Sequence, residues 1–86
     1  MGHTVRIESA RHIRAADVLV ALSAGGVEGI VLETSPCVRL RVLAEDAAEL
    51  AARVGLALEG LISEQRLALV PQRVGEAAFV LRPPAG

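Results

Sequence analysis

The chain has 86 residues, a net charge of −1 and a hydrophobic content of 52%. This length allows one domain, and a domain this small buries only about 60% of the surface of its unfolded chain, so it gains from association. The near-neutral charge argues against a general binder of nucleic acid or anionic membranes. No apolar run reaches the ~18 residues of a membrane span, and one cysteine cannot form an internal disulfide, so we expect a cytoplasmic protein.

The first part of the chain contains a strand pattern followed by a helix pattern. Residues 4–8 alternate between polar and apolar side chains, which predicts a half-buried strand. From Arg14 onward apolar residues recur at helical spacing until Gly25 and Gly26, and glycine commonly ends a helix. We therefore expect a strand, a connection over residues 9–13 and a first helix.

A β-hairpin and a second helix come next. The runs 29–34 and 38–42 are predicted strands, joined by a turn around Pro36. Acidic residues then crowd the start of a long apolar stripe, where they suit the positive end of a helix dipole. We expect this second helix to end at Gly60 or to continue to about Glu64.

Two short apolar runs, 67–70 and 77–81, occupy the C-terminal part. Pro71 cannot donate a hydrogen bond to a strand ladder, so it ends the first run or lies on a sheet edge. The first run completes a β-α-β-β-α-β order. The second run is then either an added edge strand or an arm that pairs with another subunit, and residues 83–86 are a frayed tail.

This order predicts a single α+β domain over residues 1–86, a ferredoxin-like two-layer sandwich. We expect an antiparallel sheet, with a probable extra C-terminal strand, covered by two helices on one face. The other face of the sheet is then left open. The core must be aliphatic, because Phe79 is the only aromatic residue.

Strand alternation predicts which side chains lie on that open face. We expect the first and third strands to be central neighbours that lie parallel to each other. The residues expected on the open face, as an interface or an anion-binding site, are Arg6, Arg39, Arg41, Glu8, Glu33 and Val31. Three arginines so close together need compensation, which the two glutamates, a partner carboxylate or a bound anion can supply.

Three interpretations of this face remain open. It is a solvated surface with Arg–Glu pairs worth about 0–1 kcal/mol each, a subunit interface, or a site for a small anionic ligand. Apolar surface expected beside the arginines, at Gly29, Val31, Ala68 and Val70, favours the interface.

His12 stands just before the first helix, with Arg14 two places later. A helix N-terminus can bind a phosphate, and a neighbouring arginine can clamp it. This short stretch resembles the active-site loop of the histidine-containing phosphocarrier protein of the sugar phosphotransferase system. The resemblance implies that His12 accepts a phosphoryl group beside Arg14. That family has Gly-Leu before the histidine, where this chain has Ala10-Arg11.

The predicted order is also similar to that of the amino-acid-binding regulatory domains, which bind ligands at subunit interfaces near the first loop and helix. This resemblance implies a small ligand, such as an amino acid or an organic anion, near residues 9–14. The characteristic glycine of that loop is absent here.

The residues do not form a pattern that predicts catalysis. Cys37 follows the turn proline, but a reactive cysteine needs a nearby cation, histidine or helix N-terminus, and a base. The sequence places no histidine beside it and leaves its exposure open. His3 and His12 lack the spacing of a metal site. We therefore expect no enzyme activity, no cofactor and no metal.

We predict a noncatalytic association module that acts through its open sheet face. It forms a homo-oligomer, most simply a dimer, or serves as a small subunit or regulatory partner in a larger complex. The alternatives are a small-ligand sensor and a phosphocarrier-like protein that uses His12. We expect neither nucleic acid nor membrane as a partner, since the predicted central strands lack the aromatic residues on which bases stack.

Overall fold

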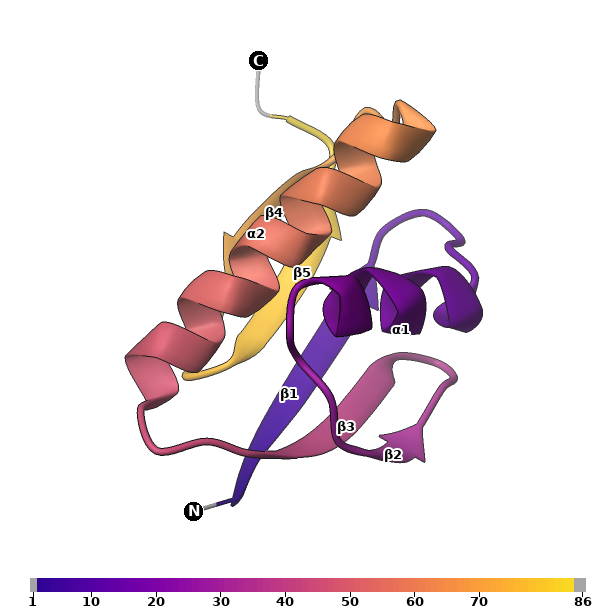
Figure 1. Cartoon of the computed structure of the whole chain (residues 1–86). Coiled ribbons are helices and arrows are strands. Elements are labelled where there is room, and N and C mark those ends of the chain that lie inside the picture. Colours follow the sequence, from indigo (N-terminus) through magenta and orange to yellow (C-terminus); the bar gives the residue numbers. More distant parts are fainter. Residues whose placement is uncertain (1, 85–86) are drawn as a thin grey trace.

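The computed structural model describes residues 2–84 as an α+β fold of two layers (Figure 1). Its elements in chain order are β1 (Gly2–Ser9), α1 (Ala15–Ala24), β2 (Ile30–Glu33), β3 (Val38–Leu43), α2 (Ala47–Gln65), β4 (Val70–Arg73) and β5 (Ala78–Arg82). The five strands form one sheet. The predicted tail of residues 83–86 lies partly outside the described residues.

Helix α2 has boundaries that follow from its sequence. Asp46 Oδ1 accepts hydrogen bonds from the backbone N–H groups of Ala48 (2.8 Å) and Glu49 (3.3 Å). These bonds satisfy donors that the first turn of a helix cannot pair internally. After the last helical residue, Arg66 adopts a left-handed backbone with φ 53°. The helix therefore passes through Gly60, the earlier of its two expected ends.

The strand order is β2-β3-β1-β5-β4. Strand β1 pairs antiparallel with β3 and parallel with β5, and the two outer pairs, β2–β3 and β4–β5, are antiparallel. The sheet is therefore mixed, so the prediction of an antiparallel sheet was wrong. The prediction that the first and third strands run parallel was also wrong, although they are central neighbours as expected.

Strand β5 lies inside the sheet, between β1 and β4. This corrects the expectation that the second C-terminal run is an edge strand or an arm for another subunit. The physical reason is burial: Phe79 and Leu81 are only 6% and 0% exposed, and an interior position covers both under the helix layer. Pro71 has no N–H group, so it cannot form ladder hydrogen bonds with strands on both sides. It lies in β4, at the edge of the sheet.

Both helices cover the same face of the sheet (Figure 1). The core between the two layers is aliphatic apart from Phe79. Helix α2 packs on the sheet at Gly55, where a Cβ would lie 3.7 Å from the Phe79 ring, an ordinary contact distance, so the close packing does not depend on glycine. In the described part of the chain, neither helix combines the length and the apolar character needed to cross a membrane.

Strand β2 contains an irregularity that changes which side chains face outward. Val31 pairs with Leu40, which is buried beneath the helices, so Val31 lies on the helix side of the sheet. The expectation that Val31 lies on the open face was therefore wrong. Ile30 takes that face, and the pairing register shifts before Glu33. An extra residue in one strand resets the alternation, which is how Glu33 still reaches the open face.

Candidate interaction surface on the open sheet face

Two neighbouring strands place the predicted arginines on the face away from the helices. The alternate residues of β1 and β3 are buried under the helix layer, so the remaining side chains point to the other side. In the pairing of these strands, Arg6 lies opposite Arg39, and Arg41 lies opposite Thr4. The structure thus brings all three predicted arginines together on one surface.

Two glutamates each pair with one of these arginines. Arg6 donates to Glu8, and the Arg39 guanidinium lies 3.4 Å from the Glu33 carboxylate. The pKa of Arg6 is raised, mainly by a hydrogen bond with Cys37 and next by the negative charge of Glu8. All four charged side chains are partly exposed, so each pair contributes only about 0–1 kcal/mol. The pairs orient the arginines more than they stabilise the fold.

Cys37 lies beneath this charged cluster. Its residue is 6% exposed, and its Sγ atom lies 3.5 Å from Glu33 Oε1. The sequence left the exposure of Cys37 open, and the structure shows it buried. A buried thiol in the interior acts as a small apolar side chain, and its burial restricts access to reagents.

Arg41 and Arg82 extend the positive charge of this face. Arg82 lies opposite Val70 on the neighbouring strand and points to the same side as Arg6. Within residues 2–84 neither Arg41 nor Arg82 forms an ion pair. The face therefore holds four arginines and two glutamates, a net charge of +2.

Large apolar side chains surround the arginines. Ile30 of β2 is 70% exposed, Leu43 of β3 is 83% exposed and Val70 of β4 is 47% exposed. Ile30 lies opposite Arg41, and Val70 lies opposite Arg82. Of the four positions expected to give apolar surface beside the arginines, the strand pairing places only Val70 there; Gly29 and Ala68 lie outside the strands, and Ile30 takes the place expected for Val31. We call this set of arginines, glutamates and apolar side chains the open face.

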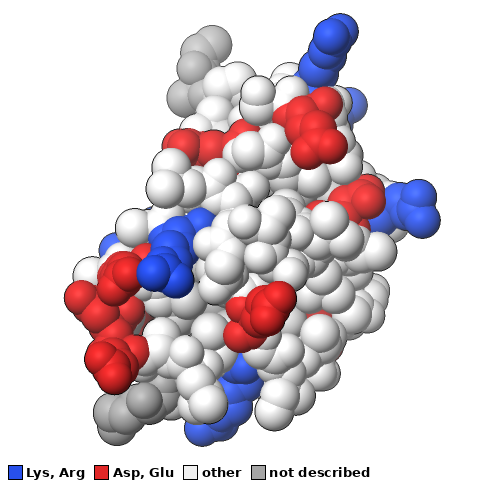
Figure 2. All heavy atoms as spheres, in the orientation of Figure 1, with Lys and Arg blue, Asp and Glu red and all other residues white. Residues whose placement is uncertain are grey.

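The helix side of the molecule has a different charge. Figure 2 views this side and shows acidic groups gathered where α2 begins. These groups are Glu45, Asp46 and Glu49. The chain has ten acidic residues, and only two of them, Glu8 and Glu33, lie on the open face. The molecule is therefore polarised, with its positive excess on the sheet side.

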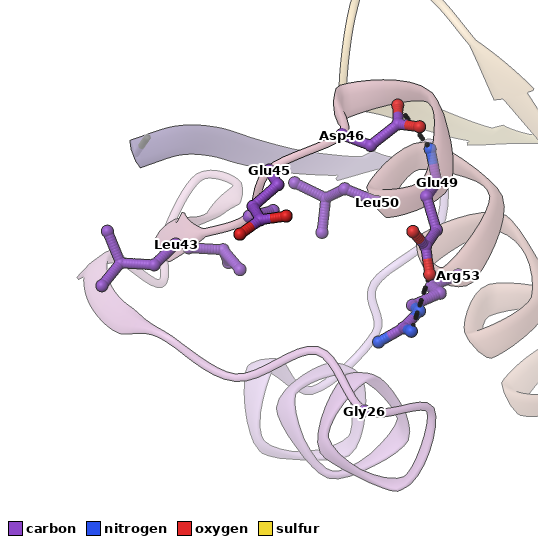
Figure 3. Close-up of a pocket in the computed structure, with 9 residues that line it drawn as sticks. Gly26, Leu43, Glu45, Asp46, Glu49, Leu50 and Arg53 are labelled. Carbon is purple, nitrogen blue, oxygen red and sulfur yellow. Dashed lines mark hydrogen bonds and ion pairs between the residues drawn. The ribbon is translucent and has the colours of Figure 1, made fainter.

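A pocket of about 240 Å³ lies at the start of α2 (Figure 3). Two of its acidic groups already have structural partners, because Asp46 caps the helix and Glu49 accepts a hydrogen bond of 2.8 Å from Arg53. Across residues 2–84, no group of three His, Cys, Asp or Glu side chains is placed to hold a metal ion. We therefore interpret this pocket as a structural feature of the start of α2.

His12 lines a second pocket, of about 200 Å³, next to the start of α1. Ser9, Arg11 and Cys37 also contribute to this pocket. The sequence did not place His12 near Cys37, and the two line the same pocket because β1 and β3 are neighbouring strands. Arg14 directly precedes α1, makes no side-chain cap and does not line the pocket. The expected clamp of His12 with Arg14 is therefore not formed around this cavity.

Sequence reasoning missed three features of these surfaces. Ile30 was missed because the irregularity in β2 leaves no signal in the sequence. Arg82 was missed because β5 was not placed inside the sheet. The alternation of residues 78–82 would otherwise have placed its side chain on the face away from the helices. His3 Nδ1 lies 3.9 Å from the Glu76 carboxylate, and no local pattern connects two residues so far apart.

Comparison with known protein families, with curated proteins and with solved structures finds no match to this chain. Its function must therefore be inferred from its own geometry and charge.

Proposed function

We propose that this chain is a noncatalytic association module whose open face binds an acidic, partly apolar surface of a protein partner. The main support is the polarity of that face: it has a net charge of +2, contributed by four arginines and two glutamates. Ile30 and Leu43 are among its exposed aliphatic side chains. Arginine is enriched in protein interfaces, and acidic residues are depleted there.

The charge of the open face favours a different protein over a second copy of the same face. Two identical faces that each have a net charge of +2 would repel each other when apposed. An acidic partner can instead pair with Arg41 and Arg82 without displacing the glutamates that already bind Arg6 and Arg39.

We further propose that the fold is a ferredoxin-like sandwich into which β5 has been inserted between β1 and β4. The order β2-β3-β1, with a helix after β1 and another after β3, supports this view. Strand β4 also runs antiparallel to β1, because β5 is parallel to β1 and antiparallel to β4. The inserted strand widens the open face and adds Arg82 to it.

Charge reversal of Arg41 tests the proposed interface. The experiment uses three baits in lysate of the native host: the wild-type chain, the variant Arg41→Glu and the control variant Arg66→Glu. Each captured protein is then titrated against all three baits to measure its Kd. Arg66 is an exposed arginine at the end of α2, away from the open face. We expect Arg41→Glu to weaken binding at least ~10-fold, about 1.4 kcal/mol, and Arg66→Glu to leave it unchanged. A partner that binds both variants equally well would contradict the proposal.

The pocket next to α1 supports a second candidate function, a sensor of a small amino acid or organic anion. Its lining combines a hydroxyl, a guanidinium and an imidazole from Ser9, Arg11 and His12. A thermal-shift screen of amino acids and organic anions tests this candidate, since a ligand at 100 times its Kd adds about 2.7 kcal/mol of stability. A true ligand loses its shift in His12→Ala, while a shift that persists there excludes this pocket. The phosphocarrier role of His12 stays a prediction.

A further inference from the structure

A hollow lies between the two helices on the side of the molecule away from the sheet. It has a volume of about 350 Å³ and an apolar lining that includes Ala21 and Ala24 of α1 and Ala57 and Gly60 of α2. A Cβ at Gly60 would meet nothing within 4 Å, so the described part of the chain leaves this space open. Figure 2 views this side, and most of the surface in view is uncharged.

Large exposed apolar side chains flank this hollow. Leu56 of α2 lines it and is 68% exposed. Val20 of α1 is 69% exposed and comes four residues before Ala24, which also lines the hollow. Residues four apart lie on the same side of a helix, so Val20 lies next to the hollow. Large apolar side chains gathered in contact with water favour burial against another molecule.

The hollow has a positive group towards one end and a negative group towards the other. Arg53 and Glu64 both line it, and about 16 Å of helix α2 separates their positions. They are therefore too far apart to pair within one chain. Arg53 Nη2 donates a hydrogen bond of 2.8 Å to Glu49, and its guanidinium has further N–H groups to donate. Within residues 2–84 Glu64 forms no ion pair.

We propose that this hollow is the interface of a homodimer in which α2 packs antiparallel against α2 of a second copy. A two-fold axis level with Leu58 sets Leu56 of each copy opposite Gly60 of the other, where the hollow receives its side chain. The same axis sets Glu64 one helix position from Arg53 of the other copy. This inference goes beyond the proposed function, because it uses the helix side and leaves the open face free.

The surface is complementary to itself, which favours a second copy over a different protein. It holds both a protruding leucine and the space for one, and both a positive and a negative group. A single two-fold axis matches the leucine with the space and the positive group with the negative one, and such an interface closes at two copies. Both helices cover the same face of the sheet, so in this dimer the two open faces point away from each other. The dimer therefore presents one open face to each of two acidic partners.

Charge reversal tests the pairing of Arg53 with Glu64 between copies, by sedimentation equilibrium from low to high micromolar concentration. Arg53→Glu alone places like charges at both contacts of the two-fold dimer, and so does Glu64→Arg alone. We expect each variant to dimerise at least ~10-fold more weakly than wild type. A mixture of the two variants in equal amounts restores opposite charges at both contacts. The mixture should therefore associate with a Kd close to that of wild type.

Leu56→Asp tests the apolar contact, and Leu43→Asp is its control, because Leu43 is an exposed leucine of the open face. We expect Leu56→Asp to weaken dimerisation on the order of 100-fold and Leu43→Asp to leave it unchanged. Urea denaturation below the dimer Kd checks that every variant folds.

A wild-type monomer at every concentration would overturn the proposal. So would a mixture of the charge variants that associates no more tightly than either alone, or a dimer lost in Leu43→Asp and kept in Leu56→Asp. The three test variants leave the open face unaltered, so loss of the dimer and loss of partner binding are separate results.

Discussion

Gly29 makes the closest backbone approach among the glycines of the described residues, and its replacement by alanine is the sharpest test of the fold. An ideal Cβ at Gly29 would lie 2.1 Å from the carbonyl oxygen and 2.9 Å from the carbonyl carbon of Arg41. These are backbone atoms of β3, so no side-chain rotation can relieve the clash. The φ angle of Gly29 lies outside the left-handed region, so the cost is steric.

The expected loss of stability follows from which part of the backbone must move. Either β2 separates from β3, or the loop that leads into β2 shifts, and such overpacking costs about 1–3 kcal/mol. We expect Gly29→Ala to destabilise the fold by about 3 kcal/mol, near the upper end of this range, because the clash is with the backbone of β3. For a domain of this size, each kcal/mol lowers Tm by roughly 4–8 °C.

Gly60 is the matched control. It lies inside α2, and a Cβ there would meet nothing within 4 Å. Gly60→Ala should therefore stabilise the protein by about 0.5–1 kcal/mol, because alanine loses less backbone entropy than glycine in a helix. The assay is urea denaturation of both variants with comparison of midpoints and m-values. A cost below about 0.5 kcal/mol for Gly29→Ala would refute the inferred steric contact with β3.

Three further predictions concern the helices and the thiol. Asp46→Ala should destabilise the chain by about 1 kcal/mol in chemical denaturation, because two backbone donors of α2 lose their acceptor. Leu58→Ala should cost about 2–5 kcal/mol, since Leu58 is 0% exposed, whereas Leu56→Ala on the same helix, 68% exposed, should change stability by less than about 0.5 kcal/mol. Cys37, 6% exposed, should react with a thiol reagent on the order of 100-fold more slowly in the native chain than in urea, and equal rates would contradict its burial.

Local periodicity predicted the parts of this fold that local interactions determine. The alternation in β1 identified Val5 and Ile7 as core residues, and both are buried. The same alternation placed Arg6, Arg39 and Arg41 on the uncovered side, where the strand pairing now puts them next to each other. Side chains of a regular strand alternate between its two faces, and this period of two residues is visible in the sequence. The face on which each side chain lies is therefore predictable once the neighbouring strands are known.

Long-range pairing was not predictable in the same way. The run that forms β5 has the composition of an edge strand or an interior strand, and only its burial beneath α2 distinguishes the two. The side of Val31 was predicted wrongly because one irregular residue in β2 reverses the alternation. That His12 and Cys37 line the same pocket depends on strand order, which local patterns do not encode.

The interior position of β5 connects these observations to association. If β5 lay at the edge of the sheet, its apolar residues Ala78–Leu81 would form an apolar edge without a proline. With β5 inside, the outer position goes to β4, whose Pro71 blocks strand addition. The same arrangement brings Arg82 onto the open face and increases its positive charge. This strand order thus gives the outer edge a proline and strengthens the face proposed to bind an acidic partner.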